Sequence, residues 1–344
     1  MLHKIISIAL VLLGTTVLTG CWDRVEIDQR GFVTGVAIDK NQSKDKHKYK
    51  ATYQLVSPSG LKQGSQGGGG STSKAYFNLS TTENSMPALS ARMASKTSRS
   101  PYFEHLKIIV ISEEIARTKG YFGDLLDFFL RNSEMRRGVQ IIISSGKASD
   151  ILNIQPVNEN MPVEYITSIV KNFRKTNFML PQSRIGDVHE FLVRKESYAI
   201  QRIKLEDSGV TLDGAAIFDG SSNTLVGMLS GQESQGLNFI KNETKGGILE
   251  SKLNERSIDF NIERMNRSIK LTSGETQPLT FDISIQVEGT LDKSVLGIDP
   301  LDEEELKKLQ DNIQQLLESN CYKTITRLQK DFKKRSNGPG GFFV

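Results

Sequence analysis

The sequence contains few of the residues from which active sites and cross-links are commonly built. Its 344 residues include two cysteines, four histidines and one tryptophan. It has no His-Glu-x-x-His pattern, no Gly-x-Ser-x-Gly pattern and no cluster of cysteines. The histidines have no metal-ligand spacing. We therefore expect no catalytic residues, no metal and no bound cofactor, and we predict that the protein is not an enzyme.

No basic block stands out along the chain, in which acidic and basic residues are interspersed. Lys and Arg total 44 and Asp and Glu total 40, so the net charge is +4. Because a nucleic-acid-binding protein usually gathers its basic residues into a patch or a tail, we expect no nucleic-acid partner. Hydrophobic residues make up 37% of the chain, which is ordinary for a globular protein and sufficient for the cores of two domains, or of three.

Long apolar runs are also missing, except at the N-terminus. Lys4 is followed by an uncharged run over 5–17, which is the pattern of a signal peptide. The run is shorter than the about 20 residues that a membrane-spanning helix needs. It closes with Leu18-Thr19-Gly20-Cys21, which matches the lipobox of bacterial lipoproteins. We predict a lipoprotein signal peptide over 1–20; a buried core cysteine and an uncleaved membrane helix are the alternatives.

The predicted lipid-attachment residue is Cys21. Its sulfur would take a diacylglyceryl group as a thioether, and the cleaved chain would carry two or three acyl chains. Each buried methylene contributes about 0.8 kcal/mol, and two chains anchor a protein stably where one does not. We therefore expect the mature chain on the outer face of a membrane. With Cys21 acylated, Cys321 has no partner for an internal disulfide.

The residues after the anchor predict an N-terminal α+β domain over 21–206. The order strand, helix, strand from 106 to 143 indicates a βαβ unit with parallel pairing, in which Ser112 caps the intervening helix. Segment 57–73 contains Gly67-Gly68-Gly69-Gly70 and is typical of a flexible surface loop, because it lacks the strand and the Lys-Ser/Thr of a phosphate-binding loop. Strands are expected at 31–39, 48–56, 75–81, 106–111 and 139–143, and helices at 84–97, 121–130, 148–154, 163–175 and 185–194.

A second α+β domain is predicted over 207–335. Its longest helix opens at Asp299-Pro300, and apolar residues recur every three or four positions from Leu306 to Phe332. We expect this stripe to pack across the C-terminal sheet, with Cys321 as a small core residue; a partner-binding helix is the alternative. A short helix is expected between 230 and 242, and antiparallel strands at 210–218, 224–229, 257–262, 267–271 and 279–291.

Several groups of residues stand in an order and at spacings that are specific when taken together. In these segments, and in the long helix, the chain resembles the Ger(x)C lipoproteins, the C subunits of nutrient germinant receptors in spore-forming bacteria. The resemblance covers about 21–334. The segments are Cys21-Trp22-Asp23 with Glu26-Ile27-Asp28, Gly31-Phe32-Val33, Ala37-Ile38-Asp39, 100–111, Leu126-Asp127-Phe128 with Arg131, Met135-Arg136-Arg137, Gly214-Ala215-Ala216-Ile217-Phe218, Leu225-Val226-Gly227 and Leu229-Ser230-Gly231.

The resemblance implies a multi-domain α+β fold, with mixed and antiparallel β-sheets flanked by helices and a long C-terminal helix packed on a sheet. It implies no catalytic activity, and as partners the integral-membrane A and B subunits of the same receptor. We therefore expect a non-enzymatic, lipid-anchored receptor subunit on the outer face of the spore inner membrane, needed for nutrient-triggered germination. A lipid-anchored solute-binding protein of a transporter is the alternative, and a cell-wall hydrolase is a further one.

The last residues depart from the resemblance. Family members continue past the long helix with an aromatic and basic segment, whereas residues 336–344 form an atypical tail. We expect the loss of a final covering element to expose part of the apolar stripe between Leu306 and Phe332.

Overall fold

The computed structural model describes residues 1–7, 26, 29–42, 48–61, 74–207, 209–253, 256–272, 280–291 and 302–332. The predicted lipid-attachment residue Cys21, the predicted tail over 336–344 and most of the glycine-rich segment over 57–73 lie outside these ranges. Within 57–73 the described part forms the short helix α2 (Pro58–Leu61).

Nine of the described strands form one mixed sheet, the large sheet. Its order is β3-β2-β1-β5-β6-β7-β8-β9, with β4 beside β1. Strands β1, β5, β6 and β7 run parallel to one another, while β2, β3, β8 and β9 join through antiparallel pairs. The bounds are β1 Arg30–Lys40, β2 Tyr49–Val56, β3 Tyr76–Glu83, β4 Ser100–Tyr102, β5 Ile108–Ser112, β6 Gln140–Ser144, β7 Tyr198–Glu206, β8 Gly209–Asp219 and β9 Thr224–Leu229.

The predicted βαβ unit is confirmed. Strand β5 pairs in parallel with β6, and α4 (Glu113–Arg117) and α5 (Tyr121–Arg131) connect them. Ser112 ends β5 and its hydroxyl accepts a hydrogen bond from the Ile115 amide at 3.5 Å, so it caps α4 as the sequence predicts.

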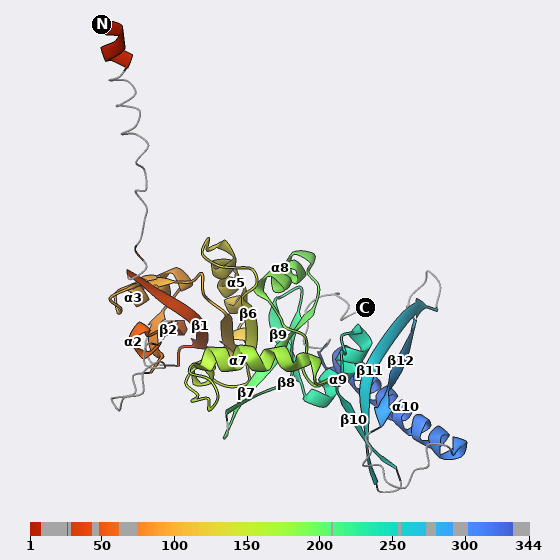
Figure 1. The fold of residues 1–344 in the computed structure, drawn as a ribbon. Helices are drawn as coiled ribbons and strands as arrows, with labels where there is room; N and C mark the ends of the chain where they lie inside the picture. Colours follow the sequence, from red (N-terminus) through yellow and green to blue (C-terminus); the bar gives the residue numbers. More distant parts are fainter. Residues whose placement is uncertain are drawn as a thin grey trace.

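Helices cover both faces of the large sheet (Figure 1). One face packs on α3 (Met86–Ala94), α5 and α8 (Ile185–Arg194). The other face packs on α6 (Ala148–Ile151) and α7 (Pro162–Val170), which the 3₁₀ turn η3 (Lys171–Arg174) follows. Because both faces are buried, the central strands are nearly continuous apolar runs, as in other sheets covered on two sides.

A separate three-stranded antiparallel sheet, the small sheet, has the order β10-β11-β12. It lies at the end of the molecule opposite to α3, together with α9 and α10 (Figure 1). Its strands are β10 (Ile248–Leu253), β11 (Arg256–Leu271) and β12 (Phe281–Leu291), and its helices are α9 (Gly231–Lys241) and α10 (Glu303–Thr326), which the π-helical turn η4 (Arg327–Phe332) extends.

The structure corrects one expected break in the small sheet. The two strands predicted at 257–262 and 267–271 form the single strand β11, whose register shifts between Ile262 and Arg264. A bulge accommodates the polar residues there without ending the strand. Strands β4, β7 and β10 were not predicted from the sequence. The domain boundary at 206/207 stays a prediction; strands β7 and β8 pair across it within one sheet.

Candidate functional site

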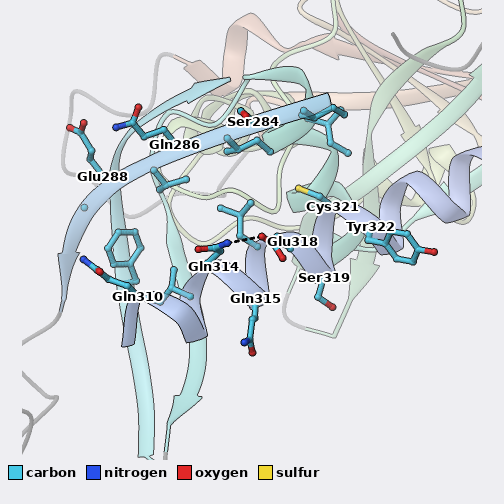
Figure 2. Close-up of a pocket in the computed structure, with 18 of the residues that line it drawn as sticks. Ser284, Gln286, Glu288, Gln310, Gln314, Gln315, Glu318, Ser319, Cys321 and Tyr322 are labelled. Carbon is cyan, nitrogen blue, oxygen red and sulfur yellow. Dashed lines mark hydrogen bonds between the residues drawn. The ribbon is translucent and has the colours of Figure 1, made fainter. Parts of the chain in front are cut away.

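A hollow lined by many apolar side chains lies between α10 and β12 (Figure 2). We call it the α10–β12 cleft. Its volume is about 1250 Å³. Strand β12 contributes residues 283–289, of which Ile285 and Val287 are partly buried. Helix α10 contributes apolar residues from successive turns: Ile313, Leu317, Cys321 and Ile325.

The cleft exists because α10 lies closer to β10 than to β12. Helix α10 packs on α9 and β10. The Asn312 side-chain amide donates to the Lys252 carbonyl of β10 at 3.2 Å. On α9, Gly236 permits close approach, since a Cβ there would collide with the Thr324 hydroxyl. That hydroxyl donates to the Glu233 carbonyl at 2.7 Å. The helix therefore leaves the inner face of β12 partly open.

The polar lining of the cleft is made of amides, hydroxyls and two acids. Glu318 accepts a hydrogen bond from the Gln314 side chain at 2.8 Å, as Figure 2 shows. Glu288 lies 3.7 Å from Arg264 of β11, and both side chains are more than half exposed. These two acids are the charged residues that line the cleft within the described part of the chain.

Cys321 lies at the base of the cleft and is buried, as the sequence predicts for a small core residue. Its Sγ is 4.0 Å from the Gly236 carbonyl oxygen. Burial, with a smaller contribution from the charge of Glu318, raises the pKa of the Cys321 thiol to about 12. The thiol therefore stays protonated at neutral pH and is a poor nucleophile.

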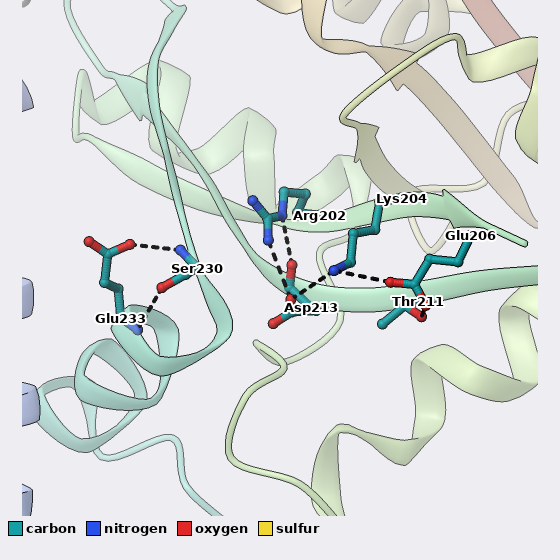
Figure 3. A network of polar contacts seen from close by, with 7 residues as sticks. All are labelled: Arg202, Lys204, Glu206, Thr211, Asp213, Ser230 and Glu233. Carbon is teal, nitrogen blue, oxygen red and sulfur yellow. Dashed lines mark hydrogen bonds and ion pairs between the residues drawn. The ribbon is translucent and has the colours of Figure 1, made fainter.

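Figure 3 shows two separate groups of polar contacts, one on the β7–β8 pair and one between Ser230 and Glu233 at the start of α9. Arg202 donates to the Asp213 carbonyl at 2.7 Å, and Lys204 lies 3.4 Å from the Asp213 carboxylate and 3.1 Å from Glu206. A hydrogen bond to Glu206 is the main cause of a raised Lys204 pKa. Gly231, at the start of α9, lies so close to Asp213 that a Cβ would collide with its carboxylate. The absence of a side chain at Gly231 therefore allows the start of α9 to pack closely against β8.

A second hollow, of about 600 Å³, lies at the carboxyl ends of β1, β5 and β6. Ligands often bind at this edge of open α/β sheets. Here Asp39 is buried and its carboxylate accepts hydrogen bonds from the amides of Ala148 and Ser149 at 2.6 and 2.9 Å. Because Asp39 already occupies the amides that open α6, we assign these contacts to the fold.

The predicted site residue Cys21 is outside the described ranges, so its role stays a prediction. Within those ranges, no group of three or more His, Cys, Asp or Glu side chains is placed to hold a metal ion.

No helix in the described segments combines the length and the apolar character that a membrane span requires.

Two family models match the chain over adjacent segments. One, described as the spore germination protein N-terminal domain, matches residues 23–205. The other, described as spore germination B3/GerAC like, C-terminal, matches residues 213–334. Together they span both sheets and α10.

Individual proteins give the same result. The chain is 26% identical to Spore germination protein YndF of Bacillus subtilis (strain 168), over 95% of this chain and 85% of that protein. It is 28% identical to Spore germination protein B3 of the same organism, over 92% and 82%. The crystal structure of the GerBC protein has the same fold, with a TM-score of 0.56 and 24% identity over 91% of this chain and 86% of that chain.

The fold and the matched segments define a class of multi-domain α+β proteins in which a mixed sheet precedes an antiparallel sheet and a long C-terminal helix. Within that class, the chain belongs to the GerAC-like family of spore germination proteins, the Ger(x)C family that its sequence resembles.

Proposed function

We propose that this protein is a non-enzymatic, lipid-anchored subunit of a spore germinant receptor and is needed for nutrient-triggered germination. The observation that carries the proposal is the match of two adjacent spore-germination family models over 23–205 and 213–334. The proposed partners are the integral-membrane A and B subunits of the same receptor. The proposed location is the outer face of the spore inner membrane.

The proposed membrane attachment is the acylated Cys21. The first family match begins at residue 23, directly after the lipobox Leu18-Thr19-Gly20-Cys21. The leader and the attachment residue therefore stand in the order that a lipoprotein requires. Two acyl chains hold the protein near the integral subunits and raise its effective concentration there. In this proposal the protein contributes to assembly of the receptor by scaffolding.

The solute-binding alternative has less support. Such a protein needs two similar lobes around a ligand cleft. The described residues instead form two unlike sheets, one mixed and covered on both faces and one antiparallel and covered on one face. Direct binding of a germinant by the purified protein would favour this alternative over the receptor proposal.

The test is deletion and complementation in the organism that makes the protein. Spores without the chain are triggered with nutrients and, separately, with an agent that bypasses the receptors. We expect the nutrient response alone to be lost and to return with the wild-type chain. Restoration with Cys21→Ala should be weak, because a single change removes the predicted attachment residue.

The strain should lack other nutrient receptors, so that no parallel receptor covers the loss. Cys21→Ser is a matched variant that keeps residue size but cannot form the thioether. A normal nutrient response in the deleted strain would contradict the receptor role. Full rescue by Cys21→Ala and by Cys21→Ser would contradict the anchor and leave the receptor role standing.

A further inference from the structure

A segment without regular secondary structure, which we call the strap (176–180), lies between the large sheet and α9. Two of its carbonyls accept hydrogen bonds from the large sheet. The Phe178 carbonyl accepts one from the Gly214 amide of β8 at 3.3 Å, and the Leu180 carbonyl accepts one from the Gln201 side chain of β7. The alternate carbonyls accept hydrogen bonds from α9. The strap is therefore attached to the large sheet on one side and presents its other side to α9.

Amide side chains join the strap to the unit that α9, α10 and the small sheet form, which we call the C-terminal unit. Asn238 of α9 donates through Nδ2 to the carbonyls of Asn177 and Met179 at 2.9 and 2.8 Å. Asn177 donates through its own Nδ2 to the Ile248 carbonyl of β10 at 3.2 Å. Asn177 and Asn238 are 1% and 2% exposed. We call these hydrogen bonds the latch, because they cross from the strap to the C-terminal unit.

Several buried polar atoms of the latch have no hydrogen-bond partner. Oδ1 of Asn177, Oδ1 of Asn238 and Oγ of Ser234 are buried, and no described residue donates a hydrogen bond to them or accepts one from them. Ser234 stands four residues before Asn238, so the two side chains share one face of α9. Folded proteins rarely bury such atoms together without a reason. All three atoms would gain hydrogen bonds from water if the joint opened, which lowers the free energy of an open state.

A second contact between the large sheet and the C-terminal unit is apolar. Leu328 and Phe332 of η4 are buried in one apolar cluster with residues of β8 and β9. Gly227 of β9 permits this contact, since a Cβ there would collide with the Phe332 ring. The chain also crosses between the two units here, from β9 through Ser230 into α9. We call this region the pivot.

The pivot and the latch lie at opposite ends of α9. In its first turn, the Glu233 carbonyl accepts a hydrogen bond from the Thr324 hydroxyl at 2.7 Å, and the Glu233 side chain lies 3.4 Å from Arg327 of η4. Asn238 lies in its last turn. The π-helical turn η4 is a rare helical form that often occurs at functional positions. A rotation about the pivot would move the end of α9 away from the strap and keep the apolar contact.

We propose that the C-terminal unit swings as one body about the pivot, and that the latch between Asn177 and Asn238 holds the closed arrangement that Figure 1 shows. On opening, water replaces the hydrogen bonds of the latch and reaches the buried oxygen atoms of Asn177, Asn238 and Ser234. The open arrangement is a minor population of the same fold, in which the secondary structure is kept. The inference stands on this geometry and does not depend on the germination role.

The test is maleimide labelling of the full chain with Cys321 replaced by Ala. Ser234→Cys places a thiol of similar size behind the latch, at a residue that is 0% exposed. Ser144→Cys, at a residue of β6 that is 1% exposed, is the matched control inside the large sheet. We expect position 234 to be labelled about tenfold faster than position 144, or more, because only the joint opens. Peptide mapping reads each position separately, so the acylation of Cys21 does not affect the result.

Removal of the latch makes the test specific. Asn238→Ala should raise the labelling rate at position 234 about tenfold and leave position 144 unchanged, because it removes hydrogen bonds that exist only in the closed arrangement. Asn320→Ala is the matched control, since the Asn320 amide of α10 donates to the Gln235 side chain of α9, within the C-terminal unit. It should leave both rates unchanged. Circular dichroism melts of each variant check that the fold is kept.

A distance measurement separates a swing of the whole unit from local unfolding of α9. Spin labels are placed at Glu190 of α8 and Asn266 of β11, which are both exposed. Electron–electron resonance should show a second distance between the labels, and its population should grow in Asn238→Ala. A single unchanged distance would reject the swing, even if position 234 is labelled fast. Equal labelling rates at positions 234 and 144, with or without Asn238, would reject the latch.

Discussion

The large and the small sheet differ in how many of their faces are buried. Helices cover both faces of the large sheet, and every residue of β5 is buried. The small sheet has helices on one face, and along β12 exposed and partly buried residues alternate over much of its length. A continuous apolar run in the sequence therefore indicates a strand that helices cover on both faces. An alternating run indicates a strand with one face exposed to solvent. The large sheet is therefore almost entirely core, whereas the small sheet exposes one of its faces to solvent.

The largest expected effect is a difference between the two sheets in how much a substitution lowers the free energy of unfolding. Ile111→Ala in β5 removes a side chain that is 0% exposed and should lower the free energy of unfolding by about 2–5 kcal/mol. Ile285→Ala, in the partly covered β12, should cost about 1 kcal/mol, because water already reaches part of that face. Urea unfolding followed by circular dichroism measures both. Equal losses would break the comparison.

An intermediate effect is expected where α9 meets α10. Gly236→Ala should destabilise the protein by about 1–3 kcal/mol, because the added Cβ collides with the Thr324 hydroxyl and forces the helices apart. Gly123→Ala in α5 is the matched change, since its Cβ would meet only the Asn223 side chain at 3.5 Å. It should stabilise the helix by up to about 1 kcal/mol. Thermal melting measures both, and a shift of the same sign would contradict the close packing of α9 on α10.

The smallest expected effect is a pH dependence from Cys321. Burial raises its pKa from 9.0 to about 12, so the folded chain keeps a proton that the unfolded chain loses as the pH rises through 9. Stability should therefore fall slightly between pH 8 and 9.5, below the range in which tyrosines titrate. Cys321→Ala should flatten this fall. Denaturant midpoints at the two pH values measure it, and identical slopes for both proteins would show that the thiol is not buried.

Much of the fold could be predicted from local patterns in the sequence. The continuous run before Ser112 located β5 and its cap, and the apolar stripe of α10 predicted that the helix packs on a sheet with Cys321 inward. Strand β7 was missed because charged residues interrupt its apolar positions, as Arg202 and Lys204 do. Because of the bulge near Arg264, the sequence predicted two strands where the structure has the single strand β11.

The cleft could not be predicted from the sequence. It depends on the lateral offset of α10, which Gly236 and Asn312 set through contacts with residues distant in the chain. The local sequence around Gly236 or Asn312 does not indicate which distant residue each one contacts. Cys21 is the opposite case, because a local motif predicts its chemistry without any reference to the fold.

Strand β1 has a mechanical consequence for a tethered protein. It lies inside the large sheet, with β2 on one side and β4 and β5 on the other. Under the proposed attachment, a pull from the membrane enters the fold at Arg30 and runs along this strand. The hydrogen bonds that β1 makes to its neighbours on both sides are then loaded in parallel, in shear. The hydrogen bonds of an outer strand would instead break one after another. The force is shared across the middle of the large sheet, and the small sheet stays unloaded.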